Sequence, residues 1–198
     1  MSDLIDVFAQ KINADRGVTG DLLEFGTGHG HSTSRIADVF NKGKIYTFDG
    51  FNGLPKTNKV IPRGTGWDEG ALQSNEQVTR QTLAPYANVI VEKCMTWDLK
   101  EPIEYGITKI SGVNVDVDLY EGTKDALNFM DKCEWKEVII RFDDWGYYRD
   151  TLQIKEEVEE HEKAAFFEFV NEKGYAHSFY DSDNATTDHR QVIVKVYR

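Results

Sequence analysis

Three aspartates in the second half of this 198-residue chain have a spacing that could gather negative charge at one place. Asp116 follows the apolar run "GVNV", and Asp143 and Asp144 follow the run "EVIIRF". If the two runs are neighbouring strands of a parallel sheet, their carboxyl ends lie at one edge and the three carboxylates converge. Two carboxylates about 4 Å apart repel by roughly 4 kcal/mol at an effective dielectric constant near 20. Such a group either keeps a proton or binds a cation.

Carboxylate oxygens are hard ligands, which favour Mg²⁺, Mn²⁺ or Ca²⁺ over Zn²⁺. A divalent cation that holds a hydroxyl group lowers the pKa of that hydroxyl and fixes its direction. We therefore predict that Asp116, Asp143 and Asp144 bind a divalent cation, with Mg²⁺ as first choice, and take part in catalysis. The structural alternative is that Asp144 caps the next helix and that Asp118 is a solvated turn residue.

The segments that must position these residues alternate between strand-like and helix-like patterns. Short apolar runs predict strands at 20–28, 43–50, 88–93, 112–120 and 137–143, and helical spacing predicts helices at 32–40, 72–83, 123–131 and 148–172. Two more strands are expected at 175–181 and 190–198, and their short connection predicts an antiparallel hairpin. The whole pattern predicts an α/β fold, with a mostly parallel sheet of seven strands and helices on both faces.

A loop and one of the predicted helices carry further expectations. The segment from Gly53 to about Gly70 is rich in Gly, Pro, Asn and Thr without a period, which predicts a long loop that covers the active site. Trp67 in this loop could stack on a sugar ring or pin the loop. In the helix at 148–172 we expect an apolar stripe, a solvated acidic face and a surface position for His161. The stripe comprises Ile154, Val158, Ala165, Phe166 and Phe169.

A glycine-rich turn, "LLEFGTGHGHS", joins the first predicted strand to the first helix, for which Ser32 or Thr33 is the expected cap. The dinucleotide pattern G-x-G-x-x-G fails here, because the sixth residue from Gly26 is His31 and the sixth from Gly28 is Thr33. What remains is G-x-G-x-G, with Glu24 before it and Asp49 at the end of the second strand. Turn formation alone, or an H-x-H metal pair of His29 and His31, are the alternatives for this segment.

An acid before G-x-G-x-G and a second acid at the end of the next strand resemble class I S-adenosylmethionine-dependent methyltransferases, which have a Rossmann-like fold. The resemblance implies S-adenosylmethionine as cofactor, with the Asp49 carboxylate accepting hydrogen bonds from both ribose hydroxyls. It also places adenine near the apolar Cys94, Met95 and Trp97, although core packing explains these three almost as well. The cofactor-binding residues expected on this basis are Glu24, Gly26, Gly28, Gly30, Ser32, Asp49, Cys94 and Trp97.

Three motifs make the resemblance more specific. "DGFNGLP" (49–55), "DVDLYEGTKDAL" (116–127) and "FDDW" (142–145) are similar to the macrocin O-methyltransferase family, which methylates sugar hydroxyls. The similarity implies a metal on Asp116, Asp143 and Asp144, and Leu119 stands where the related catechol-type enzymes carry a lysine. The general base is therefore left to a carboxylate or another residue.

The chain also departs from this family at several positions. Gly122 replaces a serine, Trp145 replaces a tyrosine, and Arg141 interrupts the fifth strand, where it pairs with an acid or lies at a polar edge. The family's helical extension at the N-terminus is missing, which leaves residues 1–19 as a short lead. A sugar or another small polar molecule is accordingly the expected acceptor.

Composition bounds the remaining possibilities. Hydrophobic residues make up 40% and charged residues 29%, and the net charge of −11 argues against nucleic acid or an anionic membrane as partner. Cys94 and Cys133 form no metal or disulfide pattern, and no signal peptide or membrane span is visible, which favours the cytoplasm. We expect one domain over 1–198, with a homo-oligomer left open. An NAD-dependent oxidoreductase and a non-catalytic cofactor-binding protein remain the alternative functions.

Overall fold

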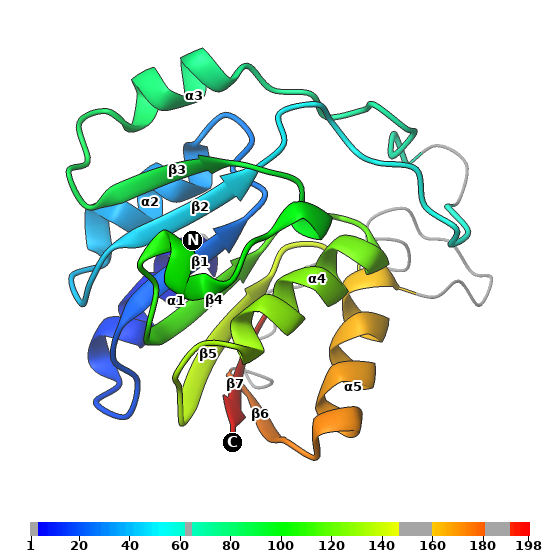
Figure 1. Ribbon diagram of the computed structural model, residues 1–198. Coiled ribbons are helices and arrows are strands. Elements are labelled where there is room, and N and C mark those ends of the chain that lie inside the picture. Colours follow the sequence, from blue (N-terminus) through cyan, green and yellow to red (C-terminus); the bar gives the residue numbers. More distant parts are fainter. Residues whose placement is uncertain (1–3, 62–64, 147–159, 181–190) are drawn as a thin grey trace.

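The computed structural model describes residues 4–61, 65–146, 160–180 and 191–198, which build one seven-stranded sheet between helices (Figure 1). Its strands are β1 (Asp21–Phe25), β2 (Ile45–Asp49), β3 (Val89–Lys93), β4 (Ile110–Val115), β5 (Glu137–Phe142), β6 (Ala176–Tyr180) and β7 (Val192–Tyr197). They lie in the order β3-β2-β1-β4-β5-β7-β6. Strands β1 to β5 are parallel, while β7 runs antiparallel to both β5 and β6. The predicted fold class and the C-terminal hairpin are confirmed.

The register of the central strands brings four chain segments to one edge of the sheet. Phe25 is paired with Phe48 of β2 and with Val115 of β4. Val115 is in turn paired with Phe142 of β5. The residues that follow these strand ends therefore leave the sheet side by side, and they include the glycine turn and the predicted acids.

Helices cover both faces because successive strand residues point to opposite sides. On one face, α1 (Leu4–Ala14) and α2 (His31–Val39) bury apolar side chains against Leu22, Ile139 and other strand residues. On the other face, α4 (Tyr120–Asp131) and α5 (His161–Lys173) pack against Leu23, Ile140 and their neighbours. The short 3₁₀ helices η1 (Thr96–Asp98) and η2 (Pro102–Tyr105) lie between β3 and β4 in the chain.

Helix α1 was not predicted, because residues 1–19 were interpreted as a short lead. Its buried residues Ile5, Phe8, Ala9 and Ile12 follow one helical stripe. This pattern was present in the sequence. None of the helices in the described ranges has the length and apolar character that crossing a bilayer requires.

Several predicted boundaries were wrong for local reasons. Helix α3 (Glu76–Leu83) starts four residues later than expected, because the Asn75 side chain accepts a hydrogen bond from the Val78 N–H and caps the helix there. Strand β4 ends at Val115 instead of residue 120, and the left-handed φ of +60° at Asp118 turns the chain into α4.

The predicted helix at 148–172 is described only from residue 160 onward. Ile154 and Val158 of its predicted stripe lie outside the described residues. The other stripe members, Ala165, Phe166 and Phe169, are buried as predicted. The acidic face was expected in solvent, and this is wrong for Glu162, which is fully buried. The expected surface position of His161 is also wrong, since that side chain is 2% exposed.

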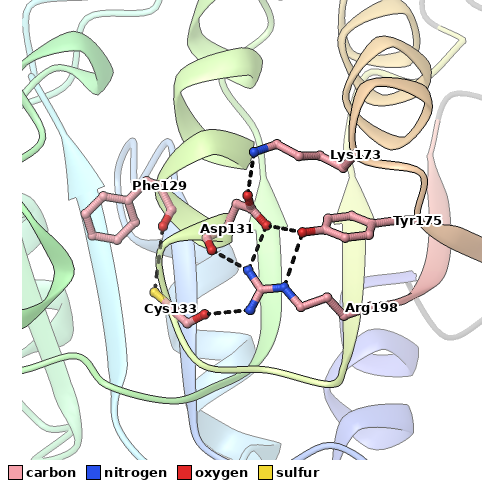
Figure 2. A network of polar contacts seen from close by, with 6 residues as sticks. All are labelled: Phe129, Asp131, Cys133, Lys173, Tyr175 and Arg198. Atoms are coloured by element: carbon pink, nitrogen blue, oxygen red, sulfur yellow. Dashed lines mark hydrogen bonds and ion pairs between the residues drawn. The ribbon is translucent and has the colours of Figure 1, made fainter.

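The last residue of the chain is tied to the end of α4, far from the carboxyl ends of the central strands (Figures 1 and 2). The Arg198 guanidinium donates to the Asp131 carboxylate (Nη2–Oδ1 2.8 Å) and to the Cys133 carbonyl (Nη1–O 3.3 Å). It also lies 4.4 Å from the centre of the Trp135 ring. Lys173 and Tyr175 donate to the same Asp131 carboxylate. These contacts fix the end of β7 against the end of α4 and the loop that leads to β5.

Candidate donor cavity and cation site

The glycine turn after β1 passes directly against the end of β4. Gly26 has a φ of +92°, and a Cβ at this residue would lie 1.7 Å from the Asp116 carbonyl oxygen. Only glycine fits this contact. Gly28 also has a left-handed φ of +52°, but a Cβ there would meet no atom within 4 Å. The backbone at Gly28 therefore faces open space.

Helix α2 begins with Gly30 as its N-cap, in a left-handed conformation and without a side-chain cap. The predicted cap at Ser32 or Thr33 was wrong. Both hydroxyl groups instead donate to the carboxylate of Glu24, Ser32 over an Oγ–Oε1 distance of 2.7 Å. The first turn of α2 is thus held to the end of β1.

Glu24 is fully buried beneath the glycine turn and does not line the cavity described below. Besides the two hydroxyls of α2, it accepts hydrogen bonds from Thr47 (Oγ1–Oε2 2.8 Å) and Asn114 (Nδ2–Oε1 2.9 Å). Burial raises the pKa of this carboxyl, while the four hydrogen bonds oppose the rise. In this structure Glu24 positions the turn. Sequence reasoning missed its partners, although Thr47 and Asn114 are conspicuous polar residues in apolar strands.

Asp49 ends β2 beside the same turn. Its Oδ2 accepts the Gly28 N–H at 2.8 Å, and its Oδ1 accepts the Phe51 N–H at 2.6 Å. Each carboxylate oxygen can accept a further hydrogen bond, since a carboxylate has about four lone-pair sites. The Asp49 carboxylate is therefore fixed in direction and still able to bind a ligand.

A cavity of about 360 Å³ opens above these strand ends, within the size range of small-molecule sites. Of the residues predicted from the sequence, those that line it are Gly26, Gly28, Ser32, Asp49, Cys94, Trp97 and Asp116. Gly30, Asp143 and Asp144 do not line it. In the described part of the chain, Asp49, Asp116 and Asp118 contribute acidic side chains to the wall, and no lysine or arginine does.

The predicted cover loop reaches the cavity through Gly53, Leu54 and Pro55. Its two ends are joined, because Leu54 N–H donates to the Ala71 carbonyl and Gly70 N–H donates to the Leu54 carbonyl, both at 2.8 Å. Trp67 does not line the cavity. It is buried, with its ring 6.1 Å from the His161 ring, so it packs the loop against the start of α5.

His29 and His31, the alternative metal pair, both line the cavity with their ring centres 6.2 Å apart. Within the described residues, the only group of three or more potential ligands that lie close enough to share a metal is formed by the predicted aspartates. The histidine pair is therefore not extended by a third ligand there.

Asp116, Asp143 and Asp144 converge as predicted, because β4 and β5 are neighbours in the sheet. One carboxylate oxygen from each residue lies within 4.8 Å of the other two. Ligands on opposite sides of one Mg²⁺ or Ca²⁺ ion lie about 4–5 Å apart, so the three oxygens fit a single divalent cation. Asp116 also lines the cavity, which places the acidic group next to it.

Arg141 pairs with an acid, one of the two outcomes expected for it. Its guanidinium donates to Asp143 Oδ1, which also accepts from Gln191 (Nε2–Oδ1 2.7 Å). It donates to Asn114 as well (Nη1–Oδ1 2.7 Å). Asp143 is therefore oriented through one oxygen, and its Oδ2 remains for another partner.

Burial and neighbouring charge act on the acids of this group. Burial raises the pKa of Asp116, and the charges of Asp143 and Asp144 raise it further. Burial likewise raises the pKa of Asp118 to about 7, with an added contribution from Asp116. Asp118 is 9% exposed and lines the cavity, so it is not the solvated turn residue of the alternative interpretation. A cap by Asp144 at residue 148 would involve residues outside the described ranges.

Comparison with known protein families gives no match, and comparison with curated proteins gives none either. Solved structures do resemble the chain. The O-methyltransferase NovP superposes with a TM-score of 0.73 at 18% identity, over 98% of this chain and 80% of that one. The calicheamicin methyltransferase CalS11 gives 0.66 at 17% identity, over 96% and 76% of the two chains.

An O-methyltransferase from Bacillus cereus, solved in complex with SAH, gives a TM-score of 0.64 at 13% identity, over 100% of this chain and 82% of that one. At these identities the likeness concerns the fold. This chain has the Rossmann-like fold of class I methyltransferases.

Proposed function

We propose that this protein is an S-adenosylmethionine-dependent O-methyltransferase that uses a divalent cation and methylates a hydroxyl group of a sugar or another small polar molecule. The observation that carries this proposal is the position of Asp116. This residue lines the cavity beside the glycine turn and belongs to the group of three aspartates. A methyl donor in the cavity and a cation at the aspartates would therefore be neighbours.

The charge of the cavity supports a sulfonium donor over NAD. S-adenosylmethionine carries a positive sulfonium, which suits a wall with Asp49, Asp116 and Asp118 and with no lysine or arginine among its described residues. The pyrophosphate of NAD is anionic and would face the same acids unpaired. The open space at Gly28 leaves room for the donor to approach the backbone.

Asp116, Asp143 and Asp144 would hold the cation. When bound, the cation would make a coordinated hydroxyl more acidic and fix its direction. The methyl group then moves from sulfur to the acceptor oxygen, and the hydroxyl proton must leave for a base. We propose Asp118 as this base, because it lines the cavity and is not one of the three aspartates proposed to hold the cation.

The sequence motifs, the net charge and the cysteines bear on the methyl acceptor and on the cellular compartment. The macrocin-type motifs favour a sugar hydroxyl, while the acidic wall favours an acceptor without phosphate or carboxylate groups. We propose no nucleic-acid or membrane partner, given the net charge of −11. Cys94 and Cys133 are free thiols, which suits a reducing cytoplasm.

Calorimetric titration with S-adenosylhomocysteine, NADH and MgCl₂ tests this function. We expect the wild type to bind S-adenosylhomocysteine and Mg²⁺ but not NADH. Asp143→Asn and Asp116→Asn should each lose at least about tenfold in Mg²⁺ affinity, as expected for a lost charged ligand. Asp116→Asn is the cleaner variant, because Asp143 also binds Arg141 and Gln191. Glu172→Gln, an exposed site on α5, is the charge control.

Unchanged Mg²⁺ affinity in both aspartate variants would refute the cation site, and binding of NADH alone would refute the donor. Protein that binds S-adenosylhomocysteine but forms none from S-adenosylmethionine with any compound of a hydroxyl library would support the non-catalytic alternative. With an acceptor from that library, Asp118→Asn should lower turnover about 100-fold or more and keep the affinity for S-adenosylhomocysteine. Asparagine tolerates the left-handed backbone at this residue.

A further inference from the structure

Glu162 is a buried acid that neither the sequence motifs nor the proposed reaction accounts for. It lies in the first turn of α5 and is fully buried. One carboxylate oxygen, Oε2, accepts the backbone N–H of Asp144 at 2.8 Å. The other, Oε1, is buried and has no hydrogen-bond partner among the residues that the structure describes. A buried carboxylate oxygen without a partner is costly, so this atom points to a missing ligand.

The surroundings of Glu162 indicate what that ligand is. Burial raises the pKa of Glu162, and the charges of Asp144, Asp116 and Asp143 raise it further. These three residues are the predicted cation ligands. The positively charged Arg141 lies beside these aspartates, and its guanidinium donates hydrogen bonds to Asp143 and Asn114. The helix N-terminus favours an acid at this position only weakly, by about 1 kcal/mol at most sites. Among the described residues at this edge, the charge of Arg141 therefore stands against the four acids Asp116, Asp143, Asp144 and Glu162.

The distance between Glu162 and the ligands also matters. Glu162 is not part of the group whose carboxylate oxygens lie within 4.8 Å of one another. It contacts that group through the backbone of Asp144. Residues in this position around metal sites hydrogen-bond the direct ligands and thereby orient them.

We propose that Glu162 is a positioning residue of the cation site, an inference that rests on the proposed function. Its Oε2 fixes the backbone at Asp144, so that the Asp144 carboxylate is presented to the cation. Its Oε1 would accept a hydrogen bond from a water molecule on the cation when the cation is bound. The residue thereby connects the first turn of α5 to the segment that follows β5.

Glu162→Gln tests this role, because glutamine keeps an oxygen for the Asp144 N–H and removes the charge. Glu172→Gln on the same helix makes the same change of charge at an exposed residue and serves as the matched control. We expect Glu162→Gln to bind Mg²⁺ about 10- to 100-fold more weakly in calorimetry, as is typical when an outer partner of a metal ligand is changed. The control should bind Mg²⁺ like the wild type, and both variants should keep their affinity for S-adenosylhomocysteine.

Wild-type Mg²⁺ affinity in folded Glu162→Gln would overturn the inference. If Asp116→Asn loses Mg²⁺ binding while Glu162→Gln keeps it, only the role of Glu162 is wrong. If neither variant changes the affinity, the proposed cation site is itself wrong. Should Glu162→Gln not fold, Glu162→Asp keeps the charge and shortens the side chain by one methylene. It should also weaken Mg²⁺ binding, and unchanged affinity there would contradict the proposal equally.

Discussion

At the scale of single residues, Gly26 and Gly28 lack a side chain for different reasons. Gly26 lies against the backbone of Asp116, where a Cβ would overlap the carbonyl oxygen. Gly28 lies beside the cavity, where a Cβ would enter open space. The first glycine is therefore required by the fold, and the second by the ligand that the cavity would hold.

We accordingly expect Gly26→Ala and Gly28→Ala to fail in different ways. Gly26→Ala combines backbone strain with a steric overlap and should cost about 3 kcal/mol, or roughly 10 °C in Tm. Gly28→Ala should cost only about 1 kcal/mol for its left-handed backbone, yet weaken S-adenosylhomocysteine binding about tenfold or more. Thermal denaturation and calorimetry of both variants measure this. Equal loss of stability in the two would contradict the assignment.

The same scale shows what a sequence can reveal about a site. Asp49, Asp116, Asp143 and Asp144 were found because each follows an apolar run, and strand ends of a parallel sheet meet at one edge. Glu162 was missed because its neighbours in the sequence are mostly polar and suggest a solvated helix. Its burial results from the packing of α5 beside Asp144, a contact between residues 18 positions apart in the chain. Local patterns do not contain such contacts.

At the scale of elements, the strands were predicted more reliably than the helix ends. Each buried strand is a short apolar run, so its position follows from composition alone. Helix ends depend on single side chains and φ values, such as the Asn75 cap and the left-handed Asp118. Helix α1 shows a different error, because its apolar stripe was visible but its segment was treated as a lead.

The hairpin of β6 and β7 gives an element-scale prediction. Arg198→Met removes the hydrogen bonds to Asp131, Cys133 and Tyr175 that tie β7 to the end of α4 (Figure 2). Loss of these charge-assisted bonds should cost about 2 kcal/mol, or roughly 5 °C in Tm. Binding of S-adenosylhomocysteine and Mg²⁺ should not change, because the site lies at the other end of the strands.

A surface arginine provides the comparison. Arg80 forms an exposed ion pair with Glu76, and Arg80→Met should cost less than about 1 kcal/mol. Thermal denaturation of both variants, with calorimetry of each, separates the two cases. If Arg198→Met loses no more stability than Arg80→Met, the hydrogen bonds of Arg198 do not contribute measurably to the stability of the fold.

At the scale of the whole molecule, the mostly parallel sheet and its antiparallel C-terminal pair were predicted from the alternation of strand-like and helix-like segments, whereas the order of the strands was not predicted. The choice of substrate does not follow from the fold, since one fold serves many functions. Net charge is the property of the whole chain that bears on substrate class. Acidic residues outnumber Lys and Arg by 34 to 23. This surplus continues into the cavity wall, where the described residues include acids but no lysine or arginine.

We therefore expect no binding of nucleic acid under any salt condition. Binding to phosphates weakens as salt rises, so a buffer with about 50 mM salt is the most permissive test. Fluorescence anisotropy of labelled RNA and duplex DNA should stay constant as protein is added, in a preparation that binds S-adenosylhomocysteine in calorimetry. A saturable rise in anisotropy that disappears with added salt would contradict this expectation. It would mean that a local basic surface outweighs the net charge, and the proposed small polar acceptor would then have to give way to a nucleic-acid hydroxyl.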